Sequence, residues 1–211
     1  IMRTLDASWT GSLRVVGDLE RPDHPYLRPS HQCYFLGEYA AGEGWQHSVT
    51  NQHIWNLKKS PQRRAFPDWQ HKARAIQTIG QTFAANVRAD HLPHMTFVPI
   101  PPSKTRKHPE FDDRVEKIAR AIGANADVRE LLVGVVERIP VHVGQQRRDQ
   151  KALRNSLSVK TEFLEPRRGI IVLLDDVLTT GCSFVVCKQM LEERMPGAQI
   201  IGMFVARRAV P

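Results

Sequence analysis

Two acidic residues followed by a threonine-rich turn form the segment of this sequence best suited to chemistry. Asp175 and Asp176 come directly after the aliphatic run at 170–174, and a Thr-Thr-Gly turn follows at 179–181. Backbone N–H groups of such a turn, and of a helix that begins after it, bind anions. The two carboxylates repel phosphate but accept hydrogen bonds from vicinal hydroxyls. The segment therefore suits a sugar phosphate, with the phosphate in the turn and the ribose hydroxyls on the acids.

The alternative interpretation of this segment is an ordinary strand-to-helix junction, with a capped helix and two solvated acids. The full pattern with Thr-Thr-Gly favours the sugar phosphate. Cys182 lies in the same turn, where a cysteine near a helix N-terminus can be nucleophilic. We interpret it instead as a small residue that fills the loop.

The stretch from Ile170 to Phe184 resembles the phosphoribosyl-pyrophosphate motif of type I phosphoribosyltransferases, in which an aliphatic strand leads to two acids and Thr-Thr-Gly. Four other segments are similar to the ComF branch of this family: 97–107 (FVPIPPSKTRK), Phe111-Asp112, Arg154-Asn155 and 39–58. The resemblance covers roughly residues 33–208. One cysteine precedes residue 182, so the cysteine-rich zinc module that often begins ComF-like proteins is not expected.

The resemblance also implies roles for individual residues. Asp175 and Asp176 would hold the ribose 2′- and 3′-hydroxyls, directly or through Mg²⁺. The residues enclosing the 5′-phosphate would be Thr179, Thr180, Gly181, Cys182 and Ser183. Those meeting the pyrophosphate would be Ser103, Lys104 and Arg106. Mg²⁺ keeps much of its water when bound, so we expect it to be held mostly by substrate and water, without a protein cage.

The implied reaction transfers phosphoribose from phosphoribosyl pyrophosphate to a nitrogen acceptor, such as a nucleobase. The ligand is therefore phosphoribosyl pyrophosphate or a nucleotide containing ribose 5-phosphate. A mobile loop should exclude water, because water would otherwise hydrolyse the donor. The candidate is the polar, basic segment 143–151, which includes Arg147, Arg148 and Lys151. Family analogy also implies a homodimer.

The charge of the chain points to polyanionic partners. Its 211 residues include 30 Lys and Arg against 22 Asp and Glu, a net charge of +8. Such a surface favours nucleotides, pyrophosphate or nucleic acid. The alternative function is therefore a phosphoribosyltransferase-fold module with altered chemistry, acting in DNA uptake or processing, as a nucleic-acid-associated regulator or as a defence effector. Basic pairs such as Lys58-Lys59 and Arg63-Arg64 fit this alternative, but no nucleic-acid-binding motif accompanies them.

The elements that must position these residues follow an α/β rhythm. Apolar runs predict strands at 33–39, 96–100, 170–174 and 200–206, and a further strand within 131–139. Helices are predicted after Ser48 or Thr50, from about Asp68, after Asp112 and at 182–195. Near-continuous apolar strands separated by helices predict a parallel sheet covered on both faces, with ligands beyond its carboxyl edge. We expect a Rossmann-like α/β fold of the type I phosphoribosyltransferase kind, with a lead-in and small hood at 1–60 and a core at 61–211.

The remaining sequence features concern location. The three cysteines form no disulfide framework and have no zinc-binding spacing, which favours a reducing cytoplasm. No run approaches the roughly 20 apolar residues that span a bilayer, and no secretory signal is visible. We therefore expect a cytoplasmic protein without a membrane partner.

Overall fold

The computed structural model describes residues 9–138 and 149–209. A six-stranded sheet in the order β1-β2-β8-β7-β3-β4 forms its centre, and all neighbouring strands are parallel except β1, which runs antiparallel to β2. The strands of this sheet are β1 (Arg14–Val15), β2 (Cys33–Ala40), β3 (Met95–Pro99), β4 (Asp127–Val128), β7 (Ile170–Leu178) and β8 (Gln199–Ala209). This confirms the α/β class with a mostly parallel sheet flanked by helices.

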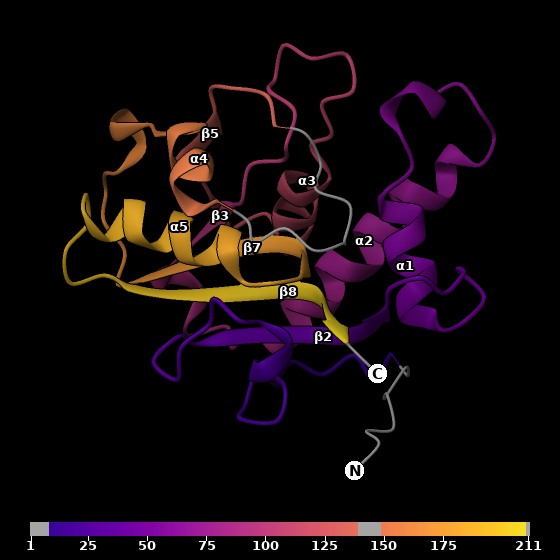
Figure 1. The fold of residues 1–211 in the computed structure, drawn as a ribbon, viewed down its shortest axis with the longest axis horizontal. Helices are drawn as coiled ribbons and strands as arrows, with labels where there is room; N and C mark the ends of the chain where they lie inside the picture. The colour runs from indigo at the N-terminus through magenta and orange to yellow at the C-terminus, as the bar shows by residue number, and fades with distance from the viewer. Residues whose placement is uncertain (1–8, 139–148, 210–211) are drawn as a thin grey trace.

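The helices form two apolar layers, one on each face of the sheet (Figure 1). Their bounds are α1 (Val49–Leu57), α2 (Trp69–Asn86), α3 (Arg114–Ala121), α4 (Gln150–Asn155) and α5 (Cys182–Glu192). Ile171 and Leu173 of β7 face the layer that contains Phe184 of α5. Val172 and Leu174 face the layer that contains α1, α2 and α3. The central strand is apolar throughout because each of its faces is covered.

Local chemistry fixes the elements that lead to the site. Ser48 begins α1 because its Oγ accepts the N–H of Asn51 at 3.0 Å. The buried Asn51 side chain also accepts the N–H of Ala40 and donates to its carbonyl, both at 3.1 Å. These bonds join the end of β2 to the start of α1. In α2, Gly80 has no side chain where Ala121 of α3 approaches, so the two helices pack closely.

Three strands differ from the sequence prediction. The predicted strand at 131–139 lies outside the main sheet: β5 (Leu132–Gly134) pairs antiparallel with β6 (Leu157–Val159) in a separate two-stranded sheet. The edge position beside β3 is taken by β4, whose two residues are too few to leave a pattern in the sequence. The central strand β7 continues to Leu178, four residues further than predicted.

The start of the chain and the start of α3 also differ from expectation. β2 falls within the expected lead-in and hood at 1–60, yet it pairs with β8 inside the main sheet. The N-cap of α3 is Asp113 rather than Asp112. Asp112 instead accepts the N–H of Arg114 at 3.1 Å and forms buried ion pairs. Within the described ranges, no helix combines the length and apolar character needed to cross a membrane.

Candidate functional site

The extension of β7 places both acids within the strand rather than after it. Asp176 points to the face covered by α3, where it pairs with Arg114. The charge of Asp175 contributes, after burial, to raising the pKa of Cys187 of α5 to about 12. Both acids were predicted beyond the end of the strand. The strand continues because the ladder with β8 pairs residues as far as Leu178.

The turn after β7 has the backbone geometry expected of an anion cradle. Gly181 has a φ of +83° and forms the N-cap of α5, which begins at Cys182. A side chain at this φ is strained, which explains the glycine. Thr180 accepts the N–H of Cys182 through its hydroxyl at 3.4 Å. Cys182 is fully buried, in agreement with its interpretation as a loop filler.

The N-terminal segment from η1 (Arg21–Asp23) to Leu27 lies across this turn, and we call this segment (residues 21–27) the strap. The N–H of Tyr26 donates to the Thr180 carbonyl at 3.1 Å. Nδ1 of the buried His24 bonds to the Thr179 carbonyl and must be the donor, because a carbonyl only accepts. A Cβ on Gly181 would lie 2.8 Å from the Leu27 side chain. The strap therefore fixes the backbone of the turn from outside.

A pocket of about 150 Å³ lies where β7, the turn and α5 meet, and we call it the acid pocket. Its lining includes both acids and three residues of the predicted phosphate loop, Thr179, Gly181 and Ser183. Lys58, the C-cap residue of α1, supplies a cation from the opposite wall. The structure thus places carboxylates, turn residues and one lysine around a single cavity at the carboxyl edge of the sheet.

Asp175 is the acid whose second carboxylate oxygen is available to bind a ligand. Its Oδ1 accepts the N–H of Asp176 at 2.8 Å, and Oδ2 has no partner among the residues that the structure describes. Burial and the repulsion of Asp176 raise the pKa of Asp175 to about 7, although Arg114 and Lys58 oppose the shift. A carboxyl group in this state accepts or donates a proton near neutral pH.

Asp176 is in the opposite state. Arg114 donates to its Oδ2 through Nε at 2.9 Å and through a terminal nitrogen at 2.8 Å. The N–H of Val177 donates to Oδ1 at 2.6 Å. Burial opposes its ionisation, but the charge of Arg114 and then that of Lys58 lower the pKa of Asp176 to about 2. Asp176 is therefore a permanent anion whose two oxygens are both engaged.

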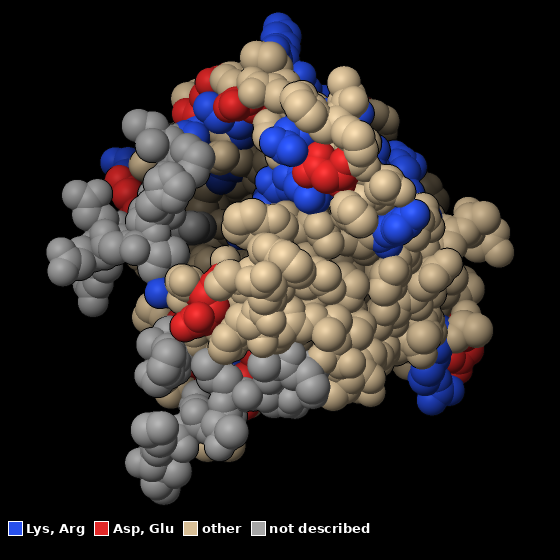
Figure 2. Space-filling view, turned by 90° about the vertical axis from the view of Figure 1, so that its right-hand side faces the viewer, with Lys and Arg blue, Asp and Glu red and all other residues tan. Residues whose placement is uncertain are grey.

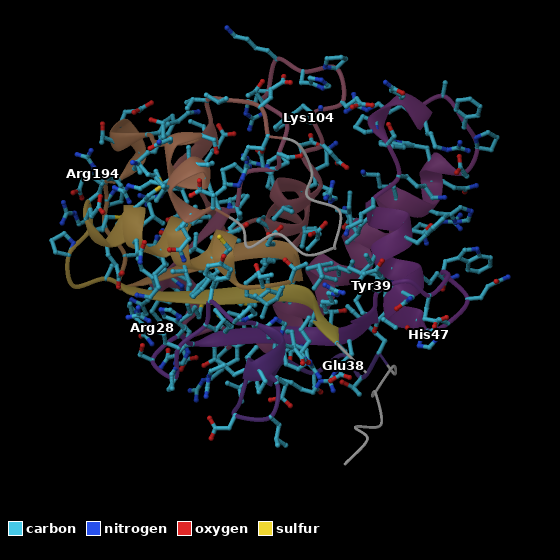
Figure 3. All side chains as sticks on the ribbon, viewed as in Figure 1. Arg28, Glu38, Tyr39, His47, Lys104 and Arg194 are labelled. Atoms are coloured by element: carbon cyan, nitrogen blue, oxygen red, sulfur yellow. The ribbon has the colours of Figure 1, made fainter. Side chains whose placement is uncertain are left out.

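The predicted pyrophosphate residues do not line the acid pocket. Arg106 pairs with Glu130 at 2.6 Å and with Glu116 at 2.8 Å. Lys104 and Arg106 line a different pocket, of about 230 Å³, beside β3 and α3. Figure 3 places Lys104 near α3, well apart from Tyr39 near α1. Arg106 is thus engaged by Glu116 of α3 and by Glu130 instead of facing the acid pocket.

Ser103 is held by its backbone rather than presented by its side chain. The N–H of Arg138 donates to the Ser103 carbonyl at 2.9 Å, and the Arg138 guanidinium donates to the Pro101 carbonyl at 2.8 Å. The bend after β3 is thereby fixed by Arg138, a residue that the sequence pattern did not single out.

The predicted flexible loop is described only at its end. Arg147 and Arg148 lie outside the described residues. Lys151 was predicted in this loop, but it lies in the first turn of α4. Lys151 is helical because Asp149 caps the N-terminus of α4. Its Oδ1 accepts the N–H groups of Lys151 at 2.8 Å and Ala152 at 3.2 Å.

Lys58 is the functional candidate that sequence reasoning missed. Its ammonium group lies 5.6 Å from the centre of the Tyr39 ring. Beyond it lies a second pocket of about 530 Å³, which shares Lys58 with the acid pocket and is lined by Tyr39, Trp45 and Trp55. The Lys-Lys pair at the predicted end of the helix was the only signal, and nothing in the sequence connected it to Asp175.

The carboxylate oxygens of Asp175 and Asp176 decide how Mg²⁺ could be bound in the acid pocket. Both oxygens of Asp176 already accept hydrogen bonds, whereas Oδ2 of Asp175 has no partner in the described chain. Across residues 9–138 and 149–209, no group of three or more His, Cys, Asp or Glu could hold a metal. The residues fit a Mg²⁺ ion that substrate and water carry and that touches the protein at Asp175.

The surface at this edge of the molecule is charged. Figure 2 faces the side of Figure 1 toward which β2 and β8 run, and it shows Lys and Arg side chains gathered around a hollow in the upper half, with acidic side chains among them. Comparison of the sequence with models of protein families and with curated proteins found no match.

Proposed function

We propose that this protein binds phosphoribosyl pyrophosphate, or a nucleotide containing ribose 5-phosphate, in the acid pocket and transfers phosphoribose to a nitrogen acceptor. Its fold would be that of the type I phosphoribosyltransferases, in the ComF-like branch. One observation carries the proposal: Asp175, the Thr-Thr-Gly turn at the start of α5 and Lys58 surround one cavity at the carboxyl edge of the sheet.

Each group around this cavity has a matching part of the ligand. The turn and the N-terminus of α5 would bind the 5′-phosphate through N–H groups and hydroxyls. Oδ2 of Asp175 would accept a ribose hydroxyl. Lys58 would lie near the anionic part of the donor, where its charge offsets that of the phosphates.

The reaction is a substitution at C1 of the ribose. A bond forms between the acceptor nitrogen and C1, while the bond from C1 to the pyrophosphate oxygen breaks and its electron pair leaves with pyrophosphate. Positive charge develops on the ribose ring and negative charge on the leaving group. Mg²⁺, when bound with the donor, would neutralise part of that negative charge. The proton that the acceptor nitrogen releases would pass to water.

Calorimetry tests this proposal directly. We expect phosphoribosyl pyrophosphate with MgCl₂ to bind the wild-type protein, and Asp175→Asn to weaken binding by about 10- to 100-fold, the effect of losing a hydrogen bond to a charged group. Asp90→Asn is the control, because Asp90 pairs with Arg88 on the exposed surface. An absence of heat with the wild-type protein would exclude the proposal. A screen of nucleobases for pyrophosphate release would then identify the acceptor.

A specific surface favours a second function, binding of single-stranded nucleic acid. The segment 58–68 has four basic residues and one acid. Exposed aromatic rings lie beside them, Trp55 at 58% and Phe66 at 52% exposure, and Arg63 lies 4.9 Å from the centre of the Phe66 ring. Basic side chains between exposed rings suit phosphates and stacked bases.

A salt series separates this function from the first. Binding of a single-stranded oligonucleotide should weaken with salt, with a log–log slope of about −0.7 for each phosphate contact. The double variant Arg63→Gln/Arg64→Gln should make the slope shallower without changing the affinity for phosphoribosyl pyrophosphate. A slope near zero with the wild-type protein would remove the nucleic-acid function.

A further inference from the structure

The two neighbouring acids of this protein have different hydrogen-bond partners. Two neighbouring acids can hold two neighbouring hydroxyls only if both reach the same ligand. Both acids line the acid pocket, but Arg114 donates twice to Asp176, whereas Oδ2 of Asp175 has no partner among the described residues. The two side chains therefore meet different surroundings although they are adjacent in sequence.

Asp176 is the first member of a chain of buried ion pairs that leads away from the acid pocket. Arg114 joins Asp176 to Asp112, with a terminal nitrogen 2.8 Å from Oδ2 of Asp112. The same Asp112 oxygen accepts Lys72 Nζ at 2.6 Å. The side chains of Lys72, Asp112 and Asp176 are 3%, 9% and 10% exposed.

This chain ends on the backbone that carries Lys58. Lys72 Nζ also donates to the Lys59 carbonyl at 2.8 Å, one residue after the lysine that lines the acid pocket. The end of α1 is thus connected through Lys72, Asp112 and Arg114 to β7. Every bond in this connection lies within the described residues.

We propose that Asp175 alone contacts the sugar, and that Asp176 is a fixed anion that compensates the charge of the largely buried Arg114. The inference rests on the proposed function, because it concerns the same pocket and ligand. It departs from the expectation that both acids hold ribose hydroxyls. The reason is energetic: if Asp176 turned to a hydroxyl, the largely buried Arg114 would lose a charged partner, and an uncompensated buried charge is strongly unfavourable.

The experiment compares two neutralisations of the acid pair. In Asp175→Asn, the oxygen that faces the pocket loses its charge. In the double variant Asp176→Asn/Arg114→Met, the ion pair is removed as a unit, so no buried charge is left alone and the introduced amide oxygen can still accept the N–H of Val177. The single variants Asp176→Asn and Arg114→Met complete a double-mutant cycle for chemical unfolding.

Binding of phosphoribosyl pyrophosphate with MgCl₂ is then measured for each folded variant. We expect Asp175→Asn to lose about 10- to 100-fold in affinity. The double variant should stay within about threefold of the wild type, the scatter normally seen for independent sites. In the unfolding cycle, each single variant should unfold at lower urea than the wild type, and the double variant should recover much of the loss. This recovery keeps the binding comparison valid where a single variant does not fold.

Two results overturn the inference in different ways. A folded double variant that binds as weakly as Asp175→Asn would show that Asp176 also holds the sugar, and the proposed function would stand. A wild-type protein that does not bind the donor would overturn the proposed function and this inference with it.

Discussion

Neighbouring carboxylates in β7 ionise differently because of where their side chains lie. Burial and the charge of Asp176 raise the pKa of Asp175 to about 7, whereas Arg114 overcomes the effect of burial and lowers the pKa of Asp176 to about 2. The pKa of an isolated aspartate is about 3.9. The pocket-facing acid is therefore held at a cost in stability, as expected where a group serves a ligand rather than the fold.

The pH dependence of stability should report this cost. Between about pH 4 and pH 7, folded Asp175 keeps a proton that the unfolded chain has released, so its contribution makes stability fall as pH rises and level off above pH 7. Asp175→Asn removes that fall. The unfolding free energy of the variant, relative to the wild type, should therefore increase from pH 4 to pH 7, as measured by urea titration.

The control for this measurement is Asp90→Asn. Arg88 lowers the pKa of Asp90, so its protonation lies below this pH range and its variant should differ from the wild type by a constant amount from pH 5 to pH 8. A flat difference for Asp175→Asn would contradict the raised pKa.

Burial decides how much an ion pair contributes to the free energy of unfolding. Two Lys–Asp pairs of this chain test that rule. Lys72→Met removes a cation from the buried pair with Asp112, and we expect a loss of about 3 kcal/mol in unfolding free energy. Lys117→Met breaks the pair with Asp113, in which the lysine side chain is 46% exposed, and should cost less than about 1 kcal/mol. Urea unfolding measures both. Equal losses of unfolding free energy in the two variants would mean that the Lys72–Asp112 pair is not buried.

At the scale of elements, the site depends on a strand, a turn and the strap that covers the turn. The strap reaches the turn from a segment about 150 residues earlier in the chain, through Tyr26, His24 and Leu27. His24 is buried, and its pKa is lowered by burial and by Arg207, against the opposing effect of the Thr179 carbonyl and of nearby acids. A neutral His24 keeps its donor on Nδ1 and so holds the Thr179 carbonyl in place.

Two glycines with the same backbone conformation isolate the contact with the strap. Gly181 and Gly197 have φ values of +83° and +85°, but a Cβ at Gly197 would meet nothing within 4 Å. Gly197→Ala should cost only the strain of the left-handed conformation, about 1 kcal/mol. Gly181→Ala should cost at least twice as much, because Leu27 must also move. In a Leu27→Ala background, Gly181→Ala should cost no more than Gly197→Ala in chemical unfolding. A cost of Gly181→Ala in the otherwise wild-type protein equal to that of Gly197→Ala would mean that the strap does not press on the turn.

At the scale of the whole molecule, the sheet separates two apolar layers, and all three cysteines lie in the layer with α5. Cys33, Cys182 and Cys187 are fully buried, and none of the three forms a disulfide. Burial raises the pKa values of Cys33 and Cys187 to about 12, so both are thiols rather than thiolates at neutral pH.

Thiol labelling should therefore follow unfolding. With Ellman's reagent at pH 8, we expect slow reaction in native buffer and three equivalents in denaturant. The labelling midpoint in urea should coincide with that of circular dichroism. One equivalent that reacts quickly in native buffer would show that the turn opens at Cys182 and would revive its interpretation as a nucleophile.

The sequence alone determined the class of fold and singled out the candidate site. Apolar runs such as 170–174 and 200–206 identified central strands, because a strand covered on both faces must be apolar throughout. Ser48, Gly181 and the spacing of apolar residues in α2 marked element boundaries correctly, because caps and tight turns are local interactions. The acids and the Thr-Thr-Gly turn could be singled out for the same reason, since they are contiguous in the chain.

Only the tertiary structure decided which of these residues face one another. Asp176 and Arg114 are 62 residues apart, and Lys58 approaches Asp175 from a different element, so no local pattern records either relation. Arg106 has the right charge for pyrophosphate, but two glutamates brought close by folding engage it. The acids lie within a strand rather than after it because Asp175, Val177 and Leu178 also pair with β8. Pairing with a neighbouring strand, rather than the residues themselves, determines where a strand ends.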